Sequence, residues 1–197
     1  MHHSSAKHAA MAAQLVVEEG LEYGPAKRRA AKMLGTRGRT ALPGNDELEA
    51  AVRDYIAVFC AHTQPAELLA LRRLAQIWMQ RLTEFRPHLS GAVWQGTATR
   101  RSDIYLQLFC DDSKAAEIAL IDQGVKYQAR SVNGFRGEPV PTLSLHVFCT
   151  DFQEEVGVHL MIHDHDDVRG ALKPGANGRA ARGDVHALQR LLAGELA

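Results

Sequence analysis

Residues Gly91–Leu106 read Gly-Ala-Val-Trp-Gln-Gly-Thr-Ala-Thr-Arg-Arg-Ser-Asp-Ile-Tyr-Leu, and the fold expected for this chain depends on them. The glycines Gly91 and Gly96 indicate a turn and a loop that folds back, because glycine adopts backbone conformations closed to other residues. From Ser102 to Cys110, apolar and polar residues alternate, which is typical of a β-strand with one buried face. The stretch therefore predicts a strand that follows a glycine turn and a short polar loop.

Helices are expected upstream of this stretch. Residues 8–34 are rich in helix-forming residues with a break at Gly24-Pro25, and residues 35–44 are expected to form a loop. Asn45 is expected to cap the next helix, and Pro65 to begin another one. The apolar stripe of that last helix predicts core packing, and it comprises Leu68, Leu71, Leu74, Ile77, Trp78 and Leu82.

Strands are expected to dominate downstream. A helix over Ser113–Gln123 and a last helix capped by Asp184 are predicted, with a polar loop over residues 170–183. This order predicts an α/β (α+β) fold, with residues 1–44 as an N-terminal helical extension and loop and residues 45–197 as the core with a closing helix. The core has a mixed sheet with flanking helices, and its further strands are Lys126–Ser131, Thr142–Thr150 and Val156–Ile162.

Composition narrows the class of protein. The 197 residues carry 23 basic and 23 acidic side chains, and this balance argues against a dedicated nucleic-acid binder. Apolar runs all fall short of the roughly 18 residues that span a membrane, so no membrane partner is expected. Three cysteines without metal-type spacing fit a reducing cytoplasm.

The stretch resembles the active-site signature of the polymerase-beta-like nucleotidyltransferase superfamily. In that signature a Gly-Ser turn is followed by a second Gly, a short polar loop and a strand reading Ser-Asp-Ile-Asp-Leu. Two positions depart from it: Ala92 stands in place of the Ser, and Tyr105 in place of the second Asp. The positions in register are Gly91, Gly96, Ser102, Asp103, Ile104 and Leu106.

The resemblance implies a phosphate turn and a metal site. Backbone N–H groups of the turn hold the triphosphate, and carboxylates hold the Mg or Mn ions that activate the attacking hydroxyl. Of the two paired carboxylates in the signature, this sequence has only Asp103. The third acid of the family lies in a strand reading roughly Val-Asp-Leu-His, and residues 156–159 put Gly157 at the acidic position.

We therefore predict a degenerate nucleotidyltransferase-like core that is a non-catalytic ligand- or partner-binding module, with a nucleotide as the candidate ligand. Tyr105 would fill the metal position or stack on a base. Asp103 would be the only catalytic-type carboxylate left. The rest of the residual binding site would be Gly91, Ala92, Gly96 and Ser102.

Two alternatives remain open. An active enzyme would need Mg or Mn and would use Asp103 with an acid recruited from Glu154, Glu155 or Asp164. A protein-interaction module would use the amphipathic helices of Asp46–Arg86 or the first helix, and a homodimer is one form of it.

Two histidine groups are further candidates. His163, Asp164 and His165 could hold zinc or manganese at a strand end, although a solvated polar turn is the preferred interpretation. His146 and His159 could flank Asp103 and Tyr105 in a polar pocket, if their strands are neighbours. No Gly-x-Ser-x-Gly signature of a serine nucleophile is present in the sequence.

Overall fold

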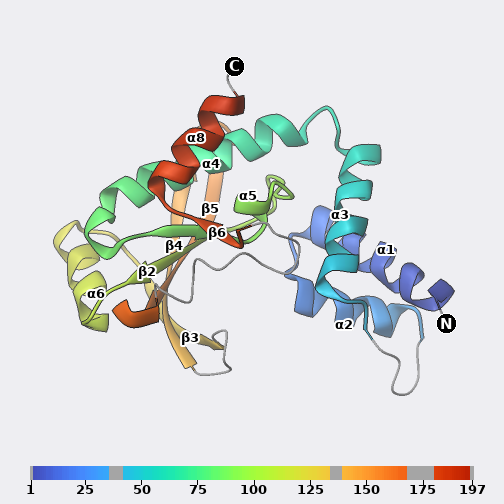
Figure 1. The fold of residues 1–197 in the computed structure, drawn as a ribbon, viewed down its shortest axis with the longest axis horizontal. Coiled ribbons are helices and arrows are strands. Elements are labelled where there is room, and N and C mark those ends of the chain that lie inside the picture. Colours follow the sequence, from blue (N-terminus) through green and yellow to red (C-terminus); the bar gives the residue numbers. More distant parts are fainter. Residues whose placement is uncertain (1, 36–41, 134–138, 168–179, 196–197) are drawn as a thin grey trace. The chain divides into compact units, whose positions relative to one another are not determined.

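The computed structural model describes residues 2–35, 42–133, 139–167 and 180–195 (Figure 1). The chain divides into two compact units. Unit 1 comprises Met1–Leu68 and Thr97–Ser102, and unit 2 comprises Leu69–Gly96 and Asp103–Ala197.

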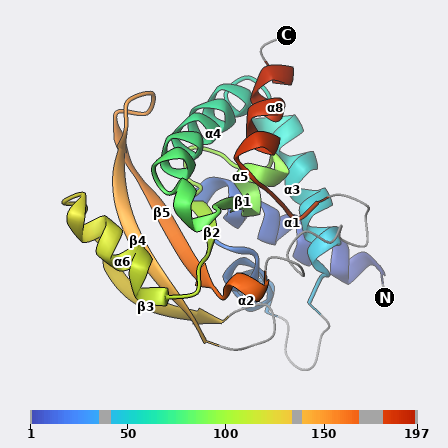
Figure 2. The same ribbon diagram turned by 60° about the vertical axis from the view of Figure 1, so that its left-hand side comes forward.

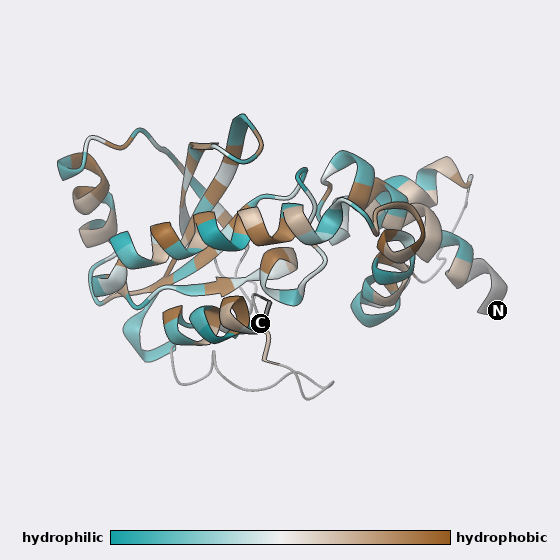
Figure 3. Cartoon of the chain, turned by 90° about the horizontal axis from the view of Figure 1, so that it is seen from above, coloured by the Kyte–Doolittle hydropathy of each residue, from teal (hydrophilic) through white to brown (hydrophobic). Residues whose placement is uncertain are grey.

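Unit 1 is helical. Helix α1 (His2–Glu19) packs against both α2 (Tyr23–Met33) and α3 (Asn45–Phe59), and α4 (Gln64–Arg81) begins in this unit. Hydrophobic and hydrophilic residues alternate along the helices, as expected where one face is buried (Figure 3). The buried cluster of the unit consists of Ala12, Ala13, Leu15, Val16, Val17, Ala26, Ala30, Leu48, Val52 and Ile56.

The break between α1 and α2 lies earlier than the predicted Gly24-Pro25. Helix α1 ends before Gly20, which has a left-handed φ of 71°. A Cβ on Gly20 would lie 2.2 Å from the carbonyl oxygen of Arg101, so only glycine fits there. Pro25 stands in the first turn of α2, where its missing N–H leaves no helical hydrogen bond unmade.

Asn45 does not cap α3 as predicted. Gly44 is the N-cap residue, and Asn45 is the first residue of the helix. The side chain of Asn45 instead accepts a hydrogen bond from Lys27 Nζ at 2.6 Å. A contact with a residue distant in sequence thus replaces the local cap.

The core interpretation of the α4 stripe is confirmed with one exception. Trp78 is 3% exposed, and the four leucines of the stripe are buried as well. Ile77 is 53% exposed, so its prediction as a core residue was wrong. Successive residues of a helix lie about 100° apart, and Trp78 occupies the buried side.

Unit 2 contains a six-stranded mixed sheet in the order β3-β4-β5-β2-β1-β6 (Figure 2). Strands β2 and β5 run parallel, and all other neighbours are antiparallel. The predicted fold class, α+β with a mixed sheet and flanking helices, is confirmed. The strands are β1 (His88–Ser90), β2 (Ile104–Phe109), β3 (Gln128–Asn133), β4 (Pro139–Cys149), β5 (Glu154–His163) and β6 (Arg182–Gly183).

In the described residues of the unit, α-helices follow three of the strands: α5 (Gly91–Gln95) follows β1, α6 (Ser113–Asp122) follows β2 and α8 (Val185–Glu195) follows β6. The elements η1 (Thr83–Phe85) and η2 (His165–Asp167) are single 3-10 turns. None of the helices in the described ranges is long and apolar enough to cross a membrane.

Two further local predictions differ in outcome. Asp184 caps α8 as predicted, accepting from the N–H of Ala187 at 2.7 Å. Asp112, rather than Ser113, caps α6 by accepting from the N–H of Lys114 at 2.8 Å. Strand β6 lies in the predicted loop of residues 170–183, of which 170–179 fall outside the described residues. Its pairing with β1 was not visible in the sequence.

The two faces of the sheet differ in chemistry. One face is apolar and buried, with Ile104, Leu106 and Leu108 of β2 at its centre. The other face carries polar residues in register across neighbouring strands. They are Asp103 just before β2, Tyr105 and Gln107 on β2, His159 on β5 and Ser144 on β4.

We expect Leu106→Ala to lower the free energy of unfolding by about 2–5 kcal/mol, because the fully buried leucine leaves a cavity in the centre of the sheet. Ile118→Ala is the control, since Ile118 is 53% exposed on α6 and its loss should cost less than about 0.5 kcal/mol. Urea unfolding followed by circular dichroism measures both. Equal losses in the two variants would contradict the assignment of the core.

Candidate functional site

The glycine turn has the conformation that the sequence predicts. Strand β1 leads into Gly91, whose φ is 70°, and α5 ends at Gly96, whose φ is 84°. Both values are left-handed, the region that favours glycine. The buried side chain of Arg72 donates to the carbonyl oxygens of Val93 at 3.1 Å and Trp94 at 3.3 Å, which secures the last turn of α5.

Asp103, just before β2, and Tyr105, within it, point to the same face of the sheet, because they are two residues apart. His159 of β5 contacts both. Its Nε2 lies 3.0 Å from Asp103 Oδ2, and its ring stacks on that of Tyr105 with centroids 4.8 Å apart and an interplanar angle of 29°. The predicted neighbourhood of Asp103, Tyr105 and His159 is therefore present in the structure, and His146, the fourth predicted member, is the cross-strand partner of Gly157 on β4.

The second ring nitrogen of His159 is also engaged. Its Nδ1 lies 2.9 Å from Ser144 Oγ on β4, so Asp103, His159 and Ser144 form one hydrogen-bonded chain across three strands. An ionised carboxylate can only accept, so Nε2 carries the hydrogen. In the neutral ring, Nδ1 is then the acceptor, and the Ser144 hydroxyl donates to it.

Asp103 is held in its ionised form. The hydrogen bond from His159 is the main cause that lowers the pKa of the carboxyl below its ordinary value, and the charges of His159 and His146 and a backbone hydrogen bond from Gly157 act in the same direction. Partial burial opposes this shift. The Asp103 side chain is 47% exposed, so its carboxylate is accessible to a ligand.

Gly157 lies against Asp103, where the resembled family has its third acid. A Cβ built on Gly157 would be 2.6 Å from both Cγ and Oδ1 of Asp103, so the carboxylate of Asp103 occupies the space of a side chain at residue 157. None of the candidate replacement acids occupies the position of residue 157. Glu154 points to the opposite face of β5, and Asp164 follows the far end of that strand. Glu155 shares the face of Gly157 but lies two residues, about 7 Å, further towards the start of β5.

The residues present do not fit a pair of divalent metal ions. Asp103 is accompanied by a phenol at residue 105 and by no side chain at residue 157, and its Oδ2 already accepts from His159. In the described part of the chain, no three His, Cys, Asp or Glu side chains are grouped so that they could hold a metal. Phenolic and imidazole groups also suit Mg poorly as ligands.

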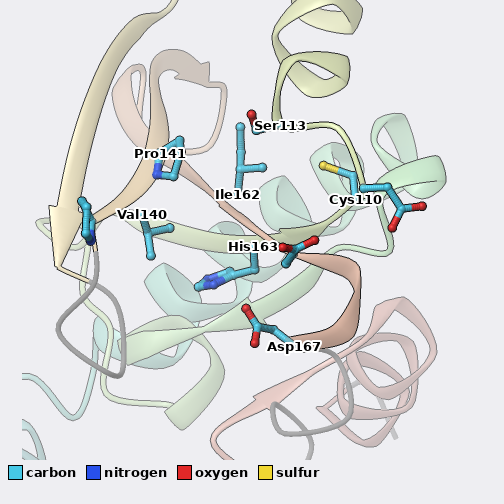
Figure 4. Close-up of a pocket in the computed structure, with 10 residues that line it drawn as sticks. Cys110, Ser113, Val140, Pro141, Ile162, His163 and Asp167 are labelled. Carbon is cyan, nitrogen blue, oxygen red and sulfur yellow. The ribbon is translucent and has the colours of Figure 1, made fainter.

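The His163–His165 cluster does not converge on one point. His163 is buried and stacks on Phe109, with ring centroids 5.5 Å apart, whereas Asp164 is exposed and His165 contacts the Arg86 guanidinium. Figure 4 shows His163 beside a cavity of about 330 Å³ at the carboxyl ends of β2 and β5. Its wall also includes Cys110, Ser113, Val140, Pro141, Ile162 and Asp167. This cavity lies at the opposite end of β5 from Gly157, about 20 Å along the strand.

The other predicted site residues lie as follows. Ala92 is in the first turn of α5, next to Gly91. Ser102 belongs to unit 1, where its hydroxyl accepts from the N–H of Thr99 at 3.0 Å. The ring of Tyr105 stacks on His159 and lies beside Gly91. Tyr105 therefore fills space in the site, the first of its two predicted roles.

Ser144 is the member of the site that sequence reasoning missed. It lies in an alternating strand and has no local motif around it. Its partner His159 is 15 residues away in sequence, and only the antiparallel pairing of β4 with β5 brings the two together.

Comparison with known proteins gives partial likenesses only. No protein-family model and no curated protein matches the sequence. Solved structures with some similarity are the Cid1 poly(U) polymerase with MgGTP bound, at 14% identity and a TM-score of 0.35, and a cytoplasmic RNA terminal U-transferase, at 18% and 0.35. A third is Cid1 in complex with the UTP analog UMPNPP, at 15% and 0.33.

These matches cover 49%, 54% and 49% of this chain and 32%, 34% and 30% of the respective solved chains. The chain thus spans about a third of the length of the structures that it matches. Similarity at these TM-scores does not establish a shared family.

We expect Gly157→Ala to displace the Asp103 side chain from His159, because the added methyl group would lie 2.6 Å from the Asp103 carboxyl carbon. The pKa of Asp103 should then rise towards its ordinary value, while the free energy of unfolding changes by about 1 kcal/mol or less, since an exposed side chain can move away. Carboxyl carbon NMR titration measures the shift. Gly194→Ala, where a Cβ meets nothing within 4 Å, is the control, and an unchanged Asp103 titration in Gly157→Ala would contradict the contact.

Stability should depend on pH through Asp103. Its folded pKa lies below the ordinary value of 3.8, so the charged form stabilises the folded state above that pH, and this contribution is lost as the pH falls from 3.8 through the folded pKa. Urea unfolding at a series of acidic pH values should show a steeper loss of stability in the wild type than in Asp103→Asn. Identical slopes would argue against the Asp103–His159 pair.

Proposed function

We propose that unit 2 is a nucleotidyltransferase-like module that binds a nucleotide but does not transfer nucleotidyl groups. The observation that supports this proposal is the contact of Gly157 with Asp103. The Asp103 carboxylate occupies the space that the side chain of a third acid at residue 157 would need. Together with Tyr105 in place of the second acid, this leaves one carboxylate where the resembled chemistry uses three. Metal charge is a main source of transition-state stabilisation in that chemistry, so its loss removes most of the rate.

The local geometry supports the resemblance on which the proposal rests. A strand, a left-handed Gly91, a short helix, a left-handed Gly96 and a strand that begins just after Asp103 follow one another in the order of the family signature. Strand β5, which contains residue 157, is the parallel neighbour of β2. These features concern the arrangement of the backbone, and the side chains at residues 92, 105 and 157 are the departures from the family.

Nucleotide transfer tests the catalytic half of the proposal. The protein is incubated with labelled nucleoside triphosphates, acceptor oligonucleotides and Mg²⁺ or Mn²⁺. We expect no more transfer by the wild type than by Asp103→Ala. Transfer that Asp103→Ala abolishes would overturn the proposal in favour of an active enzyme.

Calorimetry tests the binding half. We expect nucleoside triphosphates to bind in the presence of a chelator, because no metal site is required. Ala92→Glu should weaken this binding at least roughly tenfold, since it places a negative charge in the first turn of α5 beside the phosphate-type turn. Ala119→Glu on α6 is the control, as both alanines are half-buried helical residues. Binding that is absent at millimolar nucleotide, or equal in the two variants, would contradict a nucleotide site at Gly91.

A further inference from the structure

The polar face of the sheet contains a hydrogen-bonded chain that the nucleotide proposal does not use. Residues Tyr105, His159, Ser144 and Gln128 are cross-strand partners, one from each of β2, β5, β4 and β3. Within this row, Ser144 Oγ meets Nδ1 of His159 at 2.9 Å, and Nε2 of the same ring meets Asp103 at 3.0 Å. The hydroxyl, the imidazole and the carboxylate are thus connected in the order of a serine nucleophile, its base and the group that orients the base.

We propose that Ser144, His159 and Asp103 form a nucleophilic relay that accepts an acyl group from a small activated ester. Ser144 is the nucleophile, Nδ1 of His159 is the base, and Asp103 is a positioning residue that keeps the hydrogen on Nε2. Such relays are recognised by geometry and roles, and they occur on unrelated folds without a common sequence motif. The inference is independent of nucleotide binding.

The ring of His159 is held by contacts on its face and at both of its nitrogens. Tyr105 stacks on its face, Asp103 binds one nitrogen, and Ser144 binds the other. The His159 side chain is 19% exposed, which limits the motion and solvation of the ring. A base held in this way needs little reorganisation when the hydroxyl proton is transferred.

Gln128 is the candidate donor for the oxyanion. It lies opposite Ser144 in the register of β3 with β4, and its side chain is exposed. Arg130 donates to its Oε1 at 2.8 Å, so the amide is oriented by its oxygen and Nε2 is the end that can donate to a substrate. Side-chain amides serve as oxyanion donors in acyl transfer.

Burial of the nucleophile limits the substrate to a small acyl group. Ser144 is 5% exposed, while Gln128 and His146, its neighbours on the same face, are exposed. The carbonyl must therefore reach Ser144 past these two side chains. A short, unbranched acyl group on a good leaving group meets this requirement best.

The reaction is balanced without a cofactor. Ser144 Oγ bonds to the carbonyl carbon as its proton passes to His159 Nδ1. The carbon–oxygen bond to the leaving alcohol then breaks, and the alcohol departs with that proton. Water, deprotonated by the same nitrogen, attacks the acyl-serine, and release of the carboxylic acid restores the hydroxyl.

A fluorophosphonate probe tests the relay on the wild-type protein. The probe forms a phosphorus–oxygen bond to a reactive serine, and fluoride leaves with the hydroxyl proton as HF. We expect peptide mass spectrometry to find the label on Ser144. The readout does not depend on whether any variant folds, and a label on another serine, or none, would overturn the proposal.

Variants then separate the roles. Ser144→Ala and His159→Gln should each lower the rate of labelling or of p-nitrophenyl acetate hydrolysis by about 100-fold or more, the usual size of a general-base contribution. Ser131→Ala, an exposed serine on β3, is the control and should keep the wild-type rate. Asp103→Asn should both slow labelling and move its pH profile, which a purely structural role would not do. Hydrolysis that stays at the wild-type rate in Ser144→Ala would assign the activity to other groups and refute the relay.

Discussion

The parallel pairing of β2 with β5 is the constraint on which the polar face of unit 2 depends. It places Asp103 against Gly157 and Tyr105 against His159, while the leucines of both strands meet on the other face. A slip of one residue would turn the side chains of a strand to the opposite face. Asp103 would then enter the apolar core, where an unpaired charge costs several kcal/mol. The free-energy cost of such a shift therefore stabilises the observed register and the arrangement of the polar groups that depends on it.

The charge of Asp103 is satisfied by hydrogen bonds from protein groups. His159 donates through Nε2, and the backbone of Gly157 donates as well. A single carboxylate needs only such donors, whereas two or three carboxylates at one point repel one another unless a cation lies between them. Residues 105 and 157 carry no acidic side chain, and hydrogen bonds from His159 and the Gly157 backbone satisfy the one carboxylate that is present. One consequence is a polar face that joins a carboxylate, an imidazole and a hydroxyl.

Local sequence patterns predicted the structure correctly where it depends on residues that are close together along the chain. Alternation predicted β2, the glycine turn at Gly91 has the left-handed backbone it requires, and Asp184 caps its helix. Predictions failed where a distant residue decides the outcome. The first helix ends at Gly20, where a side chain would collide with Arg101, and not at the equally plausible Gly-Pro pair. Similarly, no local pattern distinguishes a two-residue strand such as β6 from a loop.

The sequence by itself determined which groups are available: one carboxylate at residue 103, a phenol at 105 and no side chain at 157. It also determined which of them share a face, because side chains alternate along a strand. Only the tertiary structure decided which groups meet. Strand β5 lies between β2 and β4, so His159 reaches Asp103, 56 residues away, on one side and Ser144 on the other. Strand order is set by burial of the whole apolar face, a property that no single stretch of sequence carries.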